Sequence, residues 1–211
     1  MAGASPMWEA MWAKGLRPKE AFDVGGPSPT LAEVLAKGSL GAGVGKCALV
    51  PGCGRAYDAL ALAEYGFERV VAVDLAPTAV EAAKQFLASC GNPAAARVEA
   101  DVIWDCTFLC ALDPSARTDW ARKMGELLEP EGTLITCIFP ICDKEGGPPF
   151  AMSVPLVKGL LEPAGFRAAE LREDAARHTA GGMAAGTALG LWTKAKRGGP
   201  GSRALRQMTG E

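Results

Sequence analysis

The sequence predicts an α/β fold in which a mostly parallel sheet carries helices on both faces. Two observations predict it. Short apolar runs alternate along the chain with longer segments of helical periodicity. In addition, the first clear apolar run leads into the glycine turn Gly52-Cys53-Gly54, and the next one ends in Asp74. A strand, a glycine turn, a helix and a strand with a terminal carboxylate open a doubly wound sheet, whose ligands lie at the carboxyl ends of its strands.

The N-terminal part is expected to be helical in two places. Trp8, Met11 and Trp12 share one face of a short helix over residues 7–14. A loop rich in glycine and proline follows up to Pro29, and a second helix is expected from about Thr30, because Pro-Thr is a typical helix start.

The central and C-terminal parts supply the predicted sheet. Strands are expected at 46–50, 70–74 and 133–139, and another strand begins at 102–104. The segments 167–172 and 187–193 are expected to form a closing hairpin. Helices are expected at 56–65, 77–90, 117–128 and 156–162, the second opened by Pro77 in its first turn. We interpret residues 1–196 as one domain and residues 197–211, which are rich in glycine and charge, as a disordered tail.

Composition excludes several classes of protein. With 211 residues the chain is large enough for one substantial core, and its 49% hydrophobic and 22% charged residues are ordinary for a globular protein. A net charge of −2 gives no reason to expect binding to nucleic acid or to an anionic membrane. No apolar run is long enough for a membrane span and no leader precedes Trp8. We therefore expect a cytoplasmic protein, and a monomer.

The cysteines and the histidine predict no metal site. Seven cysteines are scattered along the chain without a CxxC pair, which favours reduced thiols in the core of a cytosolic protein. A structural zinc site needs closely spaced ligands, and only one histidine is present. His178 lies in a polar segment near the C-terminus, so we expect a solvent-exposed side chain rather than a catalytic one.

The glycine turn predicts a site for an adenosine-containing cofactor. Gly52 and Gly54 permit a sharp turn and close approach of a ligand to the backbone, and the following helix directs its amide groups at the same space. Asp74 lies 20 residues after Gly54, the spacing at which a carboxylate accepts from ribose hydroxyls. Tyr57 replaces the third glycine of a dinucleotide motif, and no P-loop is present. S-adenosylmethionine fits best, because it has no pyrophosphate; a tight turn without a ligand is the alternative.

Several segments together resemble the thiopurine S-methyltransferase superfamily, in particular its plant, fungal and algal branch of thiol and halide methyltransferases. The matching stretches follow in the same order along the chain: WEAMW at 8–12, FDVGGPSPTL at 22–31, ALVPGCGRAYD at 48–58, VVAVDLAPTAVEAA at 70–83, WDCTFLCALDPSARTDWARKM at 104–124, LLEPEGTLITCIFPI at 127–141 and GGPPFAMS at 146–153. Single motifs of this set are common, but the ordered set is specific. The resemblance implies a Rossmann-like class I methyltransferase.

The resemblance also implies roles for individual residues. Trp8, Trp12 and Phe22 match aromatic residues that cover the cofactor, so residues 1–29 are expected to form a lid. The remaining cofactor-binding positions of the family correspond to Gly52, Cys53, Gly54, Asp74, Leu75, Asp105 and Cys106. Cys106 and Arg117 match positions beside the incoming nucleophile and are the candidate catalytic residues. Purely structural roles are the alternatives: the tryptophans could be core residues, and Arg117 could be a surface cation at the start of a helix.

The implied reaction is in-line transfer of the methyl group of S-adenosylmethionine to a small soft nucleophile, namely a thiol, hydrosulfide, thiocyanate or a halide. Such a nucleophile needs no strong base, so catalysis would depend on proximity and on exclusion of water by the aromatic lid. Arg117 could attract the anion, and Cys106, without a base partner, is interpreted as a small wall of the pocket.

The chain departs from the family after residue 90. Only residues 91–100 separate the helix ending near Cys90 from the strand that follows, which is too short for the third strand that relatives have at the sheet edge. We expect that strand to be missing, S-adenosylmethionine to bind more weakly, and Asp101 either to replace the lost adenine contact or to open the next strand. The alternative function is therefore a catalytically weak or inactive protein with this fold. An NAD-dependent oxidoreductase is disfavoured, because the third glycine and a catalytic acid are absent.

Overall fold

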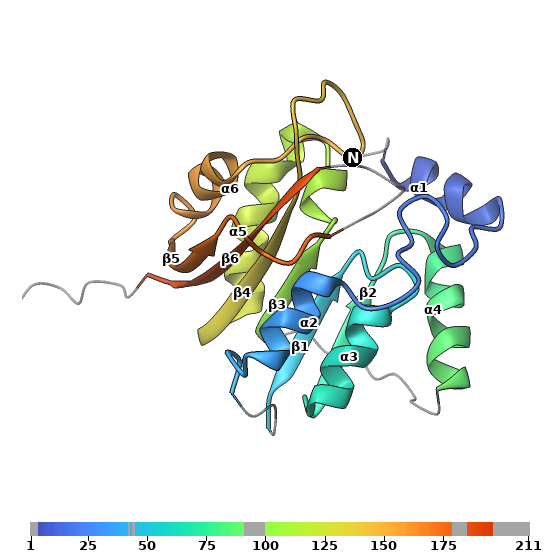
Figure 1. Ribbon diagram of the computed structural model, residues 1–211, viewed down its shortest axis with the longest axis horizontal. Helices are drawn as coiled ribbons and strands as arrows, with labels where there is room; N and C mark the ends of the chain where they lie inside the picture. Colours follow the sequence, from blue (N-terminus) through green and yellow to red (C-terminus); the bar gives the residue numbers. More distant parts are fainter. Residues whose placement is uncertain (1–3, 42, 44, 91–99, 179–184, 196–211) are drawn as a thin grey trace, which may run out of the picture.

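A computed structural model describes residues 4–41, 43, 45–90, 100–178 and 185–195, and within these ranges six strands form one sheet (Figure 1). The strands are β1 (Cys47–Pro51), β2 (Arg69–Val73), β3 (Ala100–Cys106), β4 (Leu128–Ile141), β5 (Phe166–Arg172) and β6 (Gly186–Lys194). The helices are α1 (Ala4–Ala13), α2 (Pro29–Ala36), α3 (Tyr57–Tyr65), α4 (Pro77–Ser89), α5 (Arg117–Leu127) and α6 (Val154–Leu161), with short 3-10 turns at Leu109–Ala111 and Pro114–Ala116.

The strand order is β2-β1-β3-β4-β6-β5, and the first four strands run parallel. β6 pairs antiparallel with both β4 and β5, so the closing hairpin predicted from the sequence is confirmed. The carboxyl ends of β1, β2, β3 and β4 consequently lie at one edge of the sheet, where a ligand is expected.

Helices cover both faces of the sheet, as predicted (Figure 1). On one face, buried residues of α2, α3 and α4 pack against Ala48 and Val50 of β1 and Trp104 of β3. On the other face, α5 and α6 pack against Leu49 and Ile103, the neighbours of those residues along the same strands. Alternate residues thus enter opposite layers, and both layers are apolar because the central strands are covered on both sides.

The fourth strand begins earlier than expected, at Leu128 rather than Thr133. The expected helix ran to Leu128 and the expected strand began at Thr133, but Leu128 pairs with Ala100 and regular pairing resumes at Thr133 after an irregularity. Tertiary pairing here overrides the local turn preference of proline and glycine.

Residues 91–99, in which the missing third strand was predicted, and the tail at 197–211 lie outside the described residues. Within the part of the chain that is described, β2 has one neighbour and forms an edge of the sheet. Asp101 lies at the start of β3, where its Oδ2 accepts from the Cys47 amide at 2.7 Å. It opens that strand at the end opposite to the carboxyl ends, so the idea that it replaces an adenine contact is wrong.

Candidate active site

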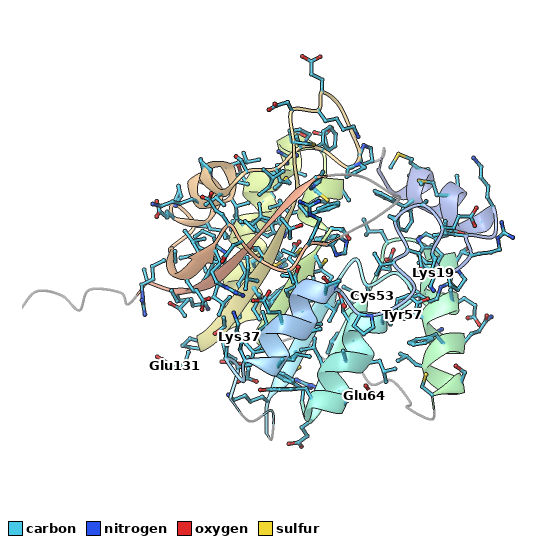
Figure 2. The ribbon with its side chains drawn as sticks, in the orientation of Figure 1. Lys19, Lys37, Cys53, Tyr57, Glu64 and Glu131 are labelled. Atoms are coloured by element: carbon cyan, nitrogen blue, oxygen red, sulfur yellow. The ribbon has the colours of Figure 1, made fainter. Side chains whose placement is uncertain are left out.

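A cavity of about 250 Å³ opens at the carboxyl ends of the parallel strands. It is lined by Met7, Trp8, Met11, Trp12, Phe22, Asp23, Val24, Gly26, Ser28, Val50, Gly52, Cys53, Gly54, Arg55, Tyr57, Asp58, Asp74, Leu75, Cys106, Thr107, Phe108, Cys110, Ala111, Leu112, Phe139, Pro148, Pro149 and His178. Figure 2 places the labelled Cys53 and Tyr57 between the sheet and the N-terminal segment. Nine of the predicted site residues meet in this lining, whereas Asp105 and Arg117 do not line it.

The glycine turn requires its glycines. Gly52 and Gly54 have φ values of +63° and +52°, in the left-handed region that other residues adopt at a cost of about 1–2 kcal/mol. A Cβ atom on Gly52 would lie 2.7 Å from Cδ2 of Phe108, so a side chain there would also collide with the wall of the cavity. The backbone of the turn is therefore bare on the side that faces the ligand.

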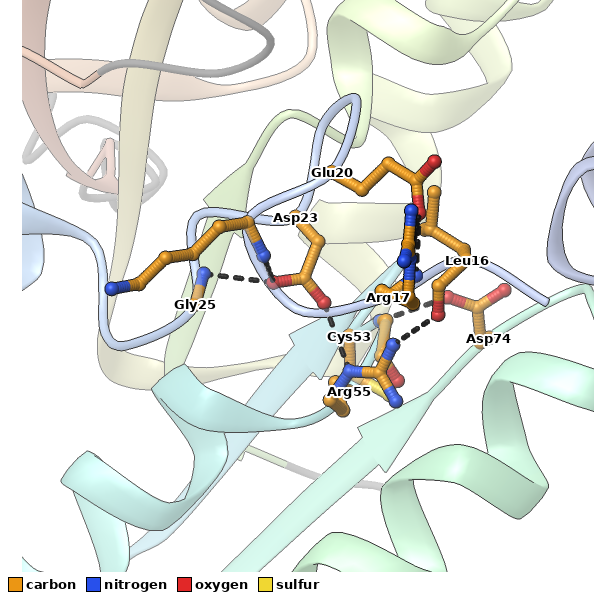
Figure 3. A network of polar contacts seen from close by, with 10 residues as sticks. Leu16, Arg17, Glu20, Asp23, Gly25, Cys53, Arg55 and Asp74 are labelled. Atoms are coloured by element: carbon orange, nitrogen blue, oxygen red, sulfur yellow. Dashed lines mark hydrogen bonds and ion pairs between the residues drawn. The ribbon is translucent and has the colours of Figure 1, made fainter.

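Asp74 is fixed at the other side of this turn. Its Oδ2 accepts from the Gly54 amide at 3.0 Å (Figure 3). Its Oδ1 accepts from the Ala76 amide at 2.9 Å. Each carboxylate oxygen can accept a second hydrogen bond, so the group remains able to bind hydroxyls. Burial and the nearby Asp74 raise the pKa of the Cys53 thiol to about 12, so this thiol is neutral.

The N-terminal segment closes the cavity as an aromatic cover. The ring of Phe22 packs edge-on against Trp8 at 5.4 Å and against Trp12 at 5.9 Å between centroids. Helix α1 is held on α4, because the carboxylate of Glu9 accepts from the Thr78 amide at 3.0 Å and from the Thr78 hydroxyl. Trp12, with Trp8 and Phe22 packed around it, therefore lies beside Gly54 of the glycine turn.

Arg55 holds the N-terminal segment against the glycine turn, a contact that the sequence did not reveal. Its Nε donates to Oδ2 of Asp23 at 2.9 Å, and its Nη2 donates to the Leu16 carbonyl at 2.7 Å (Figure 3). The guanidinium also lies 5.3 Å from the centroid of the Trp12 ring. Asp23 is 3% exposed in its side chain and accepts further from the Gly25 amide at 2.7 Å. One cation thus joins three points of the N-terminal segment to the glycine turn.

Asp58 connects the N-terminal segment with strand β3. Its Oδ1 accepts from the Ser28 amide and its Oδ2 from Nε1 of Trp104, both at 2.7 Å. Burial raises the pKa of Asp58, although both hydrogen bonds favour its charged form. The carboxylate links the end of the lid segment to the fully buried Trp104 of β3.

Asp105 lies one layer behind the cavity. Its carboxylate accepts from the Leu109 amide at 3.1 Å and from Nε1 of Trp120 at 2.9 Å. Burial raises its pKa to about 6. The sequence placed Asp105 among the cofactor-binding residues, whereas the structure places it where it shapes the turn over residues 106–109.

Arg117 is a buried cation behind the far wall. It is 7% exposed, and its Nε and Nη2 find no hydrogen-bond partner within the described residues. The guanidinium lies 5.4 Å from the ring centroid of Phe150, whose amide donates at 2.8 Å to the carbonyl of the cavity residue Cys110. Burial lowers the pKa of Arg117. The interpretation of a surface cation is therefore wrong.

His178 is also buried, which corrects the expectation of a solvent residue. It is 3% exposed, its Nδ1 lies 3.1 Å from the Ser28 hydroxyl, and its amide donates to the Thr187 hydroxyl at 3.0 Å. The same Nδ1 lies 3.7 Å from Sγ of Cys106, so Cys106 does have a potential base beside it. Burial lowers the pKa of His178 to about 4, which keeps the imidazole neutral. A hydrogen bond with Cys137 and burial raise the pKa of Cys106.

The helices in the described ranges include none that is both long and apolar enough to span a membrane.

Comparisons with known proteins identify the family. The model of the thiopurine S-methyltransferase family matches residues 4–96 and 87–190, two stretches that overlap at 87–96. A probable thiol methyltransferase 2 of Arabidopsis thaliana is 37% identical over 182 residues, which cover 79% of this chain and 76% of that protein. Thiocyanate methyltransferase 1 of Brassica oleracea is 35% identical over the same shares of the two chains.

Solved structures show the same fold. A protein studied for the conversion of a disulfide bond into a thioacetal group during echinomycin biosynthesis superposes with a TM-score of 0.72 and 19% identity, over 90% of this chain and 93% of that chain. A TehB-like S-adenosylmethionine-dependent methyltransferase from Corynebacterium glutamicum superposes with a TM-score of 0.58 and 15% identity, over 90% and 95% of the two chains. The predicted Rossmann-like class I architecture is confirmed. The chain belongs to the thiopurine S-methyltransferase family and is an S-adenosylmethionine-dependent methyltransferase.

Proposed function

We propose that the chain methylates a small soft nucleophile: a thiol, hydrosulfide, thiocyanate or a halide. The observation that carries the proposal is the cavity lining, which contains the sulfur and apolar side chains of Cys106, Cys110 and Phe139. The buried cation Arg117 lies behind the Cys110 part of this lining, where its guanidinium stacks on Phe150. An apolar wall with positive charge behind it suits a polarisable anion better than a strongly hydrated one. The thiol and thiocyanate methyltransferases among the relatives support this choice.

The cofactor would bind along the glycine turn. Gly52 and Gly54 leave the backbone open to its methionine part, the start of α3 lies beside it, and the Asp74 carboxylate would accept from the ribose hydroxyls. Trp8, Trp12 and Phe22 would cover it, and their ring faces favour the positive charge of the sulfonium. When bound, the cofactor supplies a methyl group that is activated for displacement.

The chain's own residues would then act by position rather than by acid–base chemistry. The lid excludes water from the cavity, which strips the anion of its hydration and raises its reactivity. Arg117 attracts the anion through the wall without a direct ion pair, so the nucleophile is not held too tightly to react. Cys106 and Phe139 set the size of the space, since their thiol and ring line its inner end.

A panel of nucleophiles tests this proposal. The protein is incubated with radiolabelled S-adenosylmethionine and iodide, thiocyanate, hydrosulfide or a small organic thiol, and the volatile or extractable methyl products are counted. We expect transfer to at least one of these nucleophiles. Arg117→Met should raise the KM for an anionic nucleophile about tenfold or more, and should leave the cofactor Kd within about threefold. Arg122→Met, which removes an exposed arginine of the same helix, is the matched control.

The inactive alternative makes a different prediction. A protein that binds S-adenosylmethionine but transfers no methyl group to any member of the panel would refute the proposed substrates and favour that alternative. The weaker cofactor affinity expected from the missing edge strand also stays a prediction. Isothermal titration with S-adenosylmethionine measures the Kd of this chain and of a variant with the strand restored. Equal Kd values would contradict the expected weaker binding.

A further inference from the structure

Three soft ligand atoms converge at the inner end of the cavity. Cys106 ends β3 and Cys137 lies in β4, and the two residues are direct partners in the parallel register. Their side chains therefore point to the same face of the sheet. His178 reaches the same place from the connection between β5 and β6. The two Sγ atoms and one imidazole nitrogen all lie within 4.8 Å of one another.

These separations fit a tetrahedral metal site. Zinc binds thiolate sulfur at about 2.3 Å and histidine nitrogen at about 2.0–2.1 Å, so two such ligands at a tetrahedral angle lie roughly 3.5–3.8 Å apart. Nδ1 of His178 lies 3.7 Å from Sγ of Cys106. An ion could thus sit between these atoms after only small side-chain shifts, in which it would replace the Ser28 hydroxyl as the partner of Nδ1.

The surroundings of the cluster also suit a metal. Cys106, Cys137 and His178 are 9%, 5% and 3% exposed, so an ion bound there would be shielded from competing water. The Thr30 hydroxyl lies 3.7 Å from Sγ of Cys137 and can orient this sulfur from the second layer.

We propose that Cys106, Cys137 and His178 form a site for a soft divalent ion of the zinc class. The sequence predicted no metal because it contains no CxxC pair, but adjacent parallel strands place two cysteines side by side without any short spacing. Binding releases one proton from each thiol to the solvent, and the ion gains two thiolate bonds and one imidazole bond.

The fourth coordination position would face the cavity, because Cys106 and His178 line it whereas Cys137 does not. Three protein ligands with one open position are typical of catalytic rather than structural zinc sites. A thiolate or hydrosulfide is a suitable fourth ligand. This assignment of the fourth ligand rests on the proposed function, whereas the metal site itself does not.

Cadmium titration of the full chain tests the metal site, since cadmium thiolates absorb in the ultraviolet by charge transfer. All proteins carry Cys90→Ser, because this thiol is exposed. We expect one cadmium ion and about two released protons per chain. Cys137→Ser and His178→Gln should each weaken binding tenfold or more, and each variant is checked for its melting temperature. Cys142→Ser, which removes a half-buried thiol just after β4, is the matched control and should bind as the parent does.

The outcomes are decisive without any methyl transfer. The proposal is overturned if the parent shows no stoichiometric charge-transfer band, or if both Cys137→Ser and His178→Gln bind cadmium as tightly as the parent. Loss of the band in Cys142→Ser alone would also overturn it, because the ion would then lie elsewhere. An inactive but cadmium-binding protein would refute the proposed substrates and leave this site standing.

Discussion

Replacing Arg55 by methionine should open the lid while the sheet stays folded. The change removes one charge-assisted hydrogen bond to Asp23, one hydrogen bond to the Leu16 carbonyl and the stacking on Trp12. The charge-assisted bond contributes about 2 kcal/mol and the cation–π contact about 1 kcal/mol. Together they favour the closed lid by about 3 kcal/mol, which is a factor of more than 100 in the closing equilibrium.

The cofactor also holds the lid, so only part of this free energy is lost from binding. We expect the Kd for S-adenosylmethionine to rise between tenfold and hundredfold in isothermal titration, and proteolysis within residues 14–27 to become faster. Arg122→Met is the matched control, because Arg122 is 60% exposed in its side chain and makes only surface ion pairs. A Kd within threefold of the parent, together with unchanged proteolysis, would refute the idea that Arg55 holds the lid.

Three further substitutions test other parts of the molecule. Gly52→Ala should weaken cofactor binding at least tenfold by titration, because Gly52 has a φ of +63° and a Cβ there would collide with Phe108. Gly159→Ala in helix α6 is the control and should leave binding unchanged, since open space surrounds Gly159; equal effects of the two changes would contradict the proposed strain. Asp58→Asn should cost about 1–3 kcal/mol of unfolding free energy in urea, since one of the two accepting oxygens becomes an NH2 group that faces the donor of Ser28 or of Trp104; an unchanged midpoint would count against this role. Lys37, Arg172 and the Ala176 amide hold the pKa of Glu33 at about 2, below its ordinary 4.5, so its contribution to stability is present above pH 4.5 and is lost as the pH falls towards 2. Glu33→Gln should therefore flatten the loss of melting temperature over that range, and a curve parallel to that of the parent would refute the coupling.

The local features of the fold could be predicted from the sequence. The strands that flank the glycine turn, the closing hairpin and the long helices are encoded by periodicity and by turn residues, which act over a few positions. For the same reason Gly52, Gly54 and Asp74 could be named in advance. The early start of β4 at Leu128 could not, because it depends on pairing with Ala100 rather than on the local sequence.

The polar contacts of the site were not predictable from the sequence. Arg55 meets Asp23 and Asp58 meets Ser28 across 32 and 30 residues, and His178 meets Ser28 across 150. A single charged residue in a polar segment has the same pattern whether it is buried or exposed, and only the tertiary fold decides which. The predicted site residues include nine of the twenty-eight lining residues, but not Arg55 or Asp58, and the burial of His178 was not foreseen.

The cavity can form during synthesis only after two distant segments have met. One is the connection between β5 and β6, and the other is the segment around α2. Ser28 bonds His178, Thr30 donates to the Ala176 carbonyl at 2.7 Å, and Glu33 accepts from Arg172 and from the Ala176 amide. These partners are among the last parts of the domain to leave the ribosome. A nascent chain can therefore assemble β1, β2 and the glycine turn early, but it cannot complete the inner wall until the C-terminal hairpin has emerged. Binding of S-adenosylmethionine to stalled chains of increasing length would consequently appear only after this hairpin is released.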